Sequence, residues 1–279
     1  MNQALIDLRE AAQRLGVHYM TAYRYVRMGR LPATQDGGRW LVDPKDLERL
    51  QPGRADSQAR RGHAQPEPYR ERLRERMLAG DEAGAWKLVE TFLVSGGSPQ
   101  AALVEVLAPA MREVGEGWQR GELSVGDEHR ATAVALRLVG RLGPMFVRRG
   151  RPRGKVVVAS APGDPHALPA AIVASVLRGH GYAVVELGGN TPEGSVLAEV
   201  EAAGNRLRGV VISVSSQDRL EAAQAVATAV RSVAPDTPIL IGGPAVTSEE
   251  QAAEVGSDGW ASDAAALAEL LAVPRRGSA

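Results

Sequence analysis

The hydrophobic pattern of the first fifty residues predicts a small helical domain with a β-hairpin. Apolar residues within 8–15 recur at helical spacing, a glycine interrupts the pattern, and a second apolar helical face runs through 17–26. Residues 31–42 then predict two short strands around an Asp-Gly-Gly turn, and a further helix begins near Pro44. We therefore expect residues 1–50 to form a winged helix-turn-helix domain.

The middle of the chain predicts a linker followed by a helical bundle. Residues 51–68 lack periodicity and are rich in Pro, Gly, Gln and charge, which is typical of a flexible linker. Residues 69–146 hold four apolar-periodic stretches with short connections, which predicts an antiparallel four-helix bundle. The pair Ser124 and Asp127 resembles a capping box and places the start of the last helix near Val125. The four helices are predicted at 69–79, 81–95, 98–118 and 125–146.

The C-terminal part alternates β-branched runs with helical patterns. Its strands are apolar along their whole length, which is typical of parallel strands that helices cover on both faces. Residues 147–279 therefore predict a doubly wound, five-stranded parallel sheet of the Rossmann or flavodoxin type, with its ligand site at the carboxyl ends of the strands. The strands are predicted at 155–161, 182–188, 209–215, 238–243 and 258–260, and the helices at 169–179, 192–204, 217–233 and 263–272. The whole chain is thus expected to be a multidomain α and α/β protein.

Composition narrows the possible chemistry. The chain holds 33 basic and 33 acidic residues, but residues 1–63 hold 11 basic against 7 acidic side chains, an excess that suits a polyanionic partner. The absence of cysteine excludes disulfides, thiolate metal sites, a cysteine nucleophile and a thioether-linked bilin. The sequence shows neither a signal-peptide pattern nor a long apolar run, which predicts a cytoplasmic protein. It also lacks a Walker loop and a Gly-x-Gly-x-x-Gly turn, which argues against nucleotide enzymes.

The polar side of the second N-terminal helix is the candidate DNA-binding surface. A helix fits the major groove, where arginine pairs with guanine edges, and neighbouring arginines contact phosphates. The alternative is a small adaptor domain with solvated arginines. Residues 7–50, with the wing GGRWLV and the following DPKDL helix, resemble the excisionase-type branch of the MerR winged-helix family, which implies operator DNA as a partner. The candidate DNA-binding residues are His18, Tyr19, Thr21, Arg24, Arg27, Arg30 and Arg39.

A histidine-containing loop follows the first strand of the C-terminal sheet. In PGDPHALP, the imidazole of His166 is suited to bind a metal while the carboxylate of Asp164 holds its second nitrogen. The alternative is a histidine that bonds only the loop backbone. The loop resembles the Asp-x-His-x-x-Gly signature of cobalamin-binding domains, with Pro169 in place of the glycine. This resemblance implies that His166 is an axial ligand of the cobalt.

Two later segments extend the same resemblance. Ser213-Val214-Ser215 is similar to the Ser-x-Leu segment of cobalamin-binding domains, with Ser215 in place of the leucine, and Gly242-Gly243 is similar to their Gly-Gly segment. The resemblance implies that both segments line the cavity for the nucleotide tail of the cofactor.

The predicted bundle carries a third set of candidate residues. Trp118 is followed, after nine residues, by Glu128 and His129, which resembles the Trp-x9-Glu-His signature of the CarH/LitR photoreceptor regulators. The resemblance implies that the indole covers an adenosyl group while the carboxylate and imidazole hydrogen-bond it. Taken alone, Trp118 would also suit a bundle core, and Glu128 the first turn of a helix. Gln119 stands where members of the family carry a histidine that replaces the lost upper ligand after illumination, so a different photoproduct is expected.

The resemblance implies a light-responsive transcription repressor rather than an enzyme. Adenosylcobalamin is expected to stabilise a dark homo-oligomer, a tetramer or dimer, on operator DNA, and photolysis of the cobalt–carbon bond to break it apart. Two alternatives stay open. One is the same architecture with another tetrapyrrole, such as a noncovalent bilin, because Gln119, Pro169 and Ser215 change corrin contacts. The other is a cobalamin-dependent enzyme component.

Overall fold

The protein divides into two compact units, Met1–Ala64 and Gln65–Ala279, each with its own hydrophobic core. The structure, a computed structural model, describes residues 5–15, 22, 25–26, 31–36, 39–49 and 65–272, without the side chains of residues 35, 36, 39, 48 and 49.

The N-terminal unit is a small antiparallel sheet packed against helices. Its sheet is ordered β1-β3-β2, with Ile6 opposite Val42 and Thr34 opposite Leu41. The expected hairpin and following helix are present, whereas β1 is an addition that two residues were too short to reveal by alternation. The described elements are β1 (Ile6–Asp7), α1 (Leu8–Arg14), β2 (Thr34–Asp36), β3 (Arg39–Val42) and α3 (Pro44–Arg49).

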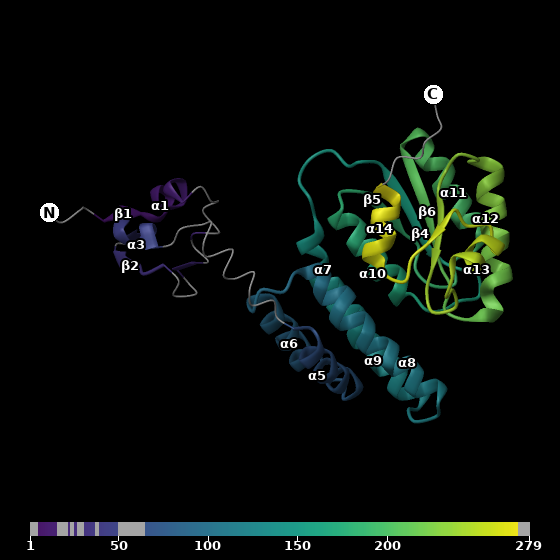
Figure 1. The fold of residues 1–279 in the computed structure, drawn as a ribbon, viewed down its shortest axis with the longest axis horizontal. Coiled ribbons are helices and arrows are strands. Elements are labelled where there is room, and N and C mark those ends of the chain that lie inside the picture. Colours follow the sequence, from purple (N-terminus) through teal and green to yellow (C-terminus); the bar gives the residue numbers. More distant parts are fainter. Residues whose placement is uncertain are drawn as a thin grey trace. The chain divides into compact units, whose positions relative to one another are not determined.

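The second unit begins with the expected helical bundle (Figure 1). A capping box starts its last long helix, because the Ser124 Oγ accepts from the Asp127 N–H at 3.1 Å while the Asp127 carboxylate accepts from the Ser124 N–H. That helix was expected to reach residue 146, but it changes to a 3-10 turn near Pro144, which has no N–H to continue the α-helical ladder. The elements are α5 (Glu67–Leu78), α6 (Glu82–Val94), α7 (Pro99–Ala101), η1 (Ala102–Leu107), α8 (Ala108–Gln119), α9 (Val125–Leu142) and η2 (Gly143–Phe146).

The third predicted helix of the bundle contains a π-helical segment, η1. Pro109 cannot donate a hydrogen bond to the carbonyl of Glu105, four residues earlier, and its ring crowds that carbonyl. The ladder instead steps back five residues, from the Ala108 N–H to the Leu103 carbonyl. The carbonyl of Glu105 accepts from the Arg70 guanidinium on α5 at 3.1 Å. The distortion therefore helps to tie two helices together.

The C-terminal part is the expected doubly wound sheet. All five strands are parallel in the order β5-β4-β6-β7-β8, the flavodoxin-like order. Helices α10 and α14 pack together on one face, and α11 and α12 on the other (Figure 1). The short α13 was not predicted. The elements are β4 (Lys155–Ser160), α10 (Leu168–Gly179), β5 (Ala183–Glu186), α11 (Glu193–Ala203), η3 (Gly204–Arg206), β6 (Leu207–Ser213), η4 (Gln217–Arg219), α12 (Leu220–Val233), β7 (Ile239–Gly242), α13 (Glu249–Glu254), β8 (Gly259–Trp260) and α14 (Ala264–Ala272).

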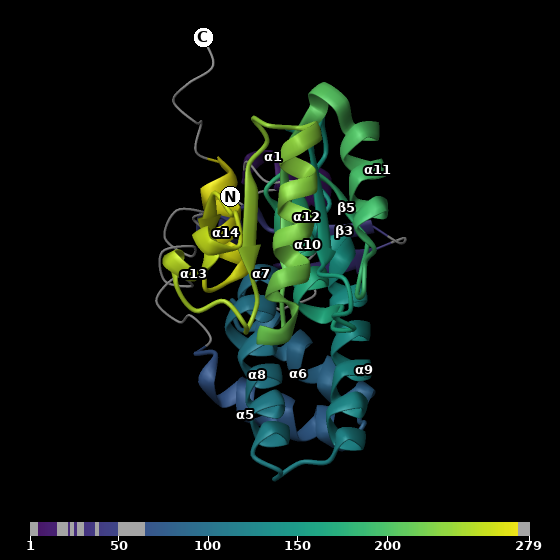
Figure 2. The ribbon, with the colours of Figure 1, turned by 90° about the vertical axis from the view of Figure 1, so that its right-hand side faces the viewer.

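The bundle packs against the sheet domain through α9, η2 and α10. Phe146 is 5% exposed, and its ring lies where a side chain at Gly179 would have to go. Figure 2 shows the bundle helices extending from this contact below the sheet domain. None of the described helices is long and apolar enough to cross a membrane.

Candidate functional site

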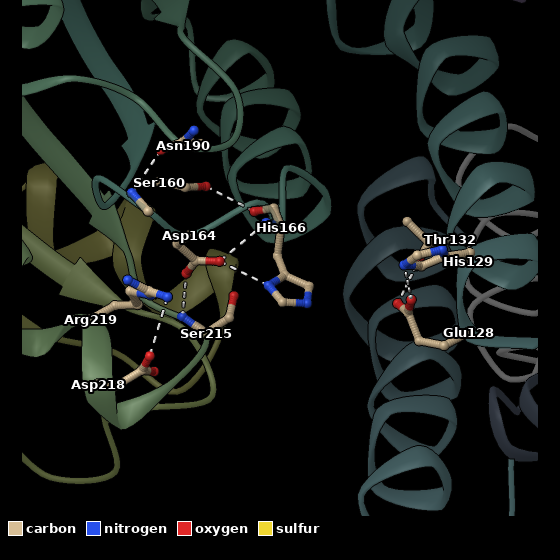
Figure 3. Close-up of polar contacts among 11 residues, drawn as sticks. Glu128, His129, Thr132, Ser160, Asp164, His166, Asn190, Ser215, Asp218 and Arg219 are labelled. Carbon is tan, nitrogen blue, oxygen red and sulfur yellow. Dashed lines mark hydrogen bonds and ion pairs between the residues drawn. The ribbon is translucent and has the colours of Figure 1, made fainter. Parts of the chain in front are cut away.

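The loop between β4 and α10 places a histidine on a buried carboxylate (Figure 3). Asp164 is 1% exposed, and its Oδ1 lies 2.8 Å from the His166 Nδ1 and accepts from the His166 main-chain N–H at 3.1 Å. Its Oδ2 accepts from the main-chain N–H of Ser215 at 2.6 Å. An Nδ1–H that donates to the carboxylate leaves Nε2 of His166 with its lone pair for a metal. The imidazole is about half exposed.

Asp164 and His166 each shift the pKa of the other. Burial would raise the pKa of Asp164, but hydrogen bonds from the His166 side chain and the Ser215 backbone outweigh it, and the net pKa lies below its ordinary value. The pKa of His166 is raised, first by its hydrogen bond to Asp164, against the opposing effect of burial, and further by the charges of Asp164 and Glu128. Glu128 belongs to the bundle, so two parts of the chain act on one imidazole.

A second loop holds the histidine loop in place. Asn190, which follows β5, donates its main-chain N–H to the Asp164 carbonyl at 2.5 Å and accepts the Gly163 N–H on its Oδ1 at 2.7 Å. Its φ of 48° is left-handed, which asparagine tolerates better than most residues. A Cβ at Gly189 would lie 2.4 Å from the Pro165 carbonyl oxygen. Sequence reasoning missed this support, although the Gly-Gly-Asn run after the second strand was its signal.

Pro169 does not disturb the histidine loop. It lies in the first turn of α10, where a backbone N–H has no helical partner to lose. The Ser160 Oγ also donates to the His166 carbonyl at 2.8 Å. A proline in place of the glycine is therefore compatible with this loop.

The carboxyl ends of β6 and β7 carry the two segments expected at the nucleotide tail. Ser213 lies opposite Gly242 in the sheet. The hydroxyl oxygens of Ser213 and Ser215 are buried and have no hydrogen-bond partner within the described part of the chain. Gly243 has a φ of 107°, and a Cβ there would lie 2.4 Å from the Val214 carbonyl oxygen. Unpartnered buried hydroxyls are costly, so these atoms fit a ligand that brings polar groups to this edge.

The three candidate residues of the bundle differ in how exposed their side chains are. Trp118 lies in the last turn of α8 and is 42% exposed, which contradicts the alternative of a bundle-core aromatic. The Glu128 side chain is 16% exposed and accepts from the Thr132 hydroxyl at 2.7 Å. The neighbouring His129 is 76% exposed, with its Nε2 3.8 Å from the Glu128 carboxylate. Figure 3 shows Glu128 on the side of α9 that faces the His166 loop.

The candidate DNA-binding residues cannot be placed in the same way. Arg39 lies in β3, but its side chain lies outside the described part of the chain. The others lie outside the described residues altogether: His18, Tyr19, Thr21, Arg24, Arg27 and Arg30.

Three segments of the chain match known domain families. Residues 5–52 match a family described as a helix-turn-helix domain. Residues 69–142 and 154–269 each match a family described as a B12 binding domain. The monomethylamine corrinoid protein of Methanosarcina barkeri is similar in fold over 73% of this chain and 97% of that chain, with a TM-score of 0.65 at 19% identity.

A curated transcription regulator is similar to most of the chain. The chain is 32% identical over 227 residues to the HTH-type transcriptional repressor CarH of Myxococcus xanthus, across 79% of this chain and 74% of that protein. It is also 24% identical over 206 residues to a corrinoid protein of Desulfitobacterium hafniense, across 71% of this chain and 93% of that protein. A match to the methionine synthase of Mycobacterium leprae, 27% identical over 64% of this chain, spans only 15% of that protein. With a helix-turn-helix domain ahead of two B12-binding domains, the chain belongs to the CarH-type family of cobalamin-binding transcription regulators.

Proposed function

We propose that the protein is a light-responsive transcription repressor with adenosylcobalamin as its chromophore. The bound cofactor supplies a cobalt–carbon bond that light breaks. In darkness the loaded protein forms a homo-oligomer, a dimer or tetramer, that holds operator DNA, and illumination separates the subunits. The cofactor achieves this only through its greater affinity for the assembled form, because a ligand shifts an equilibrium by its differential binding.

The Asp164–His166 pair is the observation that carries the proposal. The buried carboxylate of Asp164 accepts three hydrogen bonds, one of them from Nδ1 of the His166 imidazole. This orients the ring and leaves its Nε2 available. A second carboxylate, Glu128, acts on the same imidazole from the bundle. His166 would bind the cobalt of a corrin from the sheet domain, and Glu128 would approach the bound group from the bundle.

The remaining roles follow from position. Ser213, Ser215, Gly242 and Gly243 hold the nucleotide tail, since their edge of the sheet offers unpartnered hydroxyls and close backbone. Trp118, Glu128 and His129 cover the adenosyl group from the bundle. The second N-terminal helix contacts bases through His18, Tyr19, Thr21, Arg24 and Arg27, and Arg30 and Arg39 contact phosphates.

One of the three residues that favour a different tetrapyrrole no longer supports that alternative. Pro169 occupies a helix position that suits proline, so it is no reason to replace the corrin. Gln119 ends α8 beside Trp118 and is a poor cobalt ligand. We therefore propose that adenosylcobalamin binds and that its lit state lacks a side-chain ligand from position 119.

The test compares the loaded protein in darkness and after green illumination. Absorption, solution mass and operator retention are measured on one sample. We expect a corrin spectrum in the dark, and a joint change of spectrum, mass and DNA retention in the light. The variant His166→Ala should shift the dark spectrum toward a corrin without a histidine ligand, whereas His180→Ala, at the far end of α10, should match the unaltered protein. If no corrin is retained, or if light changes the spectrum alone, the proposal is wrong.

A further inference from the structure

An arginine-rich surface lies outside the site described above. No acidic residue occurs between Glu128 and Asp164, and the segment 148–155 within that interval holds four arginines and a lysine. This segment crosses from η2 to β4 as an open arc (Figure 1). Arg206 ends η3 just before β6, and Arg208 lies at the start of β6, which neighbours β4. We call these six residues the basic edge: Arg148, Arg149, Arg151, Arg153, Arg206 and Arg208.

The basic edge lies at the end of the sheet opposite to the candidate cofactor site. Parallel strands place all their amino ends together, and Lys155 at the start of β4 lies opposite Leu207 at the start of β6. His166 and Ser215, in contrast, follow the carboxyl ends of these strands. A ligand of the basic edge would therefore be distinct from the cofactor.

Local contacts hold several of these arginines in position. The Arg153 guanidinium lies over the Tyr182 ring, 5.1 Å from its centroid, and a nitrogen lies 3.5 Å from the His180 carbonyl. The stems of Arg148 and Arg153 both pass within 4 Å of the place where a Cβ of Gly181 would lie. Arg208 donates to the carbonyls of Asn205 and Leu207 at 2.9 and 2.8 Å. Ordered guanidinium groups lose less conformational entropy when they bind an anion.

The charge of the basic edge is largely uncompensated. None of its six arginines forms an ion pair with a carboxylate in the described part of the chain, and all six are exposed. Glu199 lies on this side of the sheet, but its ion pair is with Lys155 at 3.8 Å. Glu201 and Asp236 lie in neighbouring segments. Two carboxylates do not balance six arginines, so the net charge of this surface stays positive. Such a surface attracts a polyanion.

We propose that the basic edge binds the phosphate backbone of double-stranded DNA, as a second contact beside the helix-turn-helix domain. This rests on the DNA-binding part of the proposed function. Arginine forms paired hydrogen bonds with phosphate, and contacts to phosphates add affinity without sequence preference. Duplex already held by the N-terminal domain is present at a high local concentration, because one chain carries both surfaces. The basic edge thus adds phosphate contacts outside the bases that the N-terminal domain recognises.

The experiment measures how strongly the full-length protein binds a duplex that lacks the operator, over a series of salt concentrations. Arg149→Gln/Arg151→Gln removes two exposed charges that make no hydrogen bond or ion pair to other described residues. Each lost phosphate contact should reduce the slope of log affinity against log salt by about 0.9, so the double variant should lose about one to two units. Affinity for operator and non-operator duplexes should fall by the same factor.

The matched control is Arg72→Gln/Arg112→Gln, which removes two exposed arginines of the bundle. It should leave the slope unchanged. An unchanged slope in Arg149→Gln/Arg151→Gln, or a protein that binds no duplex, overturns the inference. So does a variant that keeps its DNA binding and loses binding to phosphatidylglycerol vesicles, which would identify a membrane surface instead. Corrin spectra of the same samples report separately on the proposed function, because the basic edge is remote from His166.

Discussion

At the scale of single residues, the candidate site depends on hydrogen bonds that converge on one loop. The Asp164 carboxylate accepts from the Ser215 N–H, and the Asp164 carbonyl accepts from the Asn190 N–H. The Gly163 N–H donates to the Asn190 side chain. None of these partners is close to the loop in sequence. The position of the imidazole therefore depends on Ser215 and also on Asn190, a residue to which we assign no contact with the cofactor.

Asn190 offers a test of this dependence. Asn190→Ala loses the bond to Gly163 and places alanine at a φ of 48°, so we expect a loss of about 2 kcal/mol in the free energy of unfolding. Asn190→Gly removes the bond without the strain and should cost about 1 kcal/mol. Asn190→Asp keeps an acceptor and should retain most of the stability. Denaturant unfolding of the cofactor-free protein measures all three, and equal stability of all variants would exclude a supporting role.

At the scale of elements, the start of α9 is decisive because Glu128 lies in its first turn. The capping box of Ser124 and Asp127 determines where the helix begins, and so which way the carboxylate points. Ser124→Ala should cost about 1 kcal/mol in unfolding free energy and loosen this turn. Ser98→Ala, at the N-cap of α7, is a control of equal size that leaves α9 untouched. If both variants lose the same stability but only Ser124→Ala weakens corrin binding, the helix start has the role we assign it.

The same capping box predicts a dependence on pH. The pKa of Asp127 is lowered, first by the hydrogen bond from the Ser124 side chain and then by the Ser124 backbone. A carboxylate with a lowered folded-state pKa stabilises the fold above its unfolded value of 3.8, and this is lost as pH falls through the folded-state pKa. Unfolding curves of Ser124→Ala and the unaltered protein should therefore converge in part below pH 3.8. A constant difference down to that range would contradict the charged cap.

At the scale of the whole molecule, the bundle and the sheet domain belong to one compact unit. Phe146 joins them, because its ring is buried against α10 next to Gly179. We expect this contact to help keep Glu128, on α9, opposite the histidine loop. Cofactor binding between two domains is sensitive to such a joint, since both sides of the site must approach together.

We expect Phe146→Ala to lower the free energy of unfolding by about 3 kcal/mol and to separate the unfolding of the bundle from that of the sheet domain. Met145→Ala removes an exposed neighbour, 51% accessible, and should change stability by less than about 0.5 kcal/mol. Calorimetry distinguishes one transition from two. A single unshifted transition in Phe146→Ala would show that the joint lies elsewhere.

Local sequence patterns were sufficient for the element types and for the parts of the site that are contiguous. Continuous β-branched runs predicted the parallel strands, and Ser124 with Asp127 predicted a helix start, because both depend on residues that are neighbours in the chain. The short β1 and α13 and the π-helical segment were missed, since two to six residues carry too little periodicity. The pairing of Asp164 with His166 was expected because only one residue separates them. Whether these residues bind cobalamin stays a prediction.

The tertiary structure decided what depends on strand order. Because β4 lies between β5 and β6, loops that are distant in sequence meet at one edge of the sheet, and this brings Asn190 and Ser215 to Asp164. The same order gathers Arg153 and Arg208 at the opposite edge. The packing of α9 on α10 turns Glu128 toward His166 and leaves His129 exposed. Such contacts arise from which apolar surfaces bury one another, and no local pattern in the sequence specifies them.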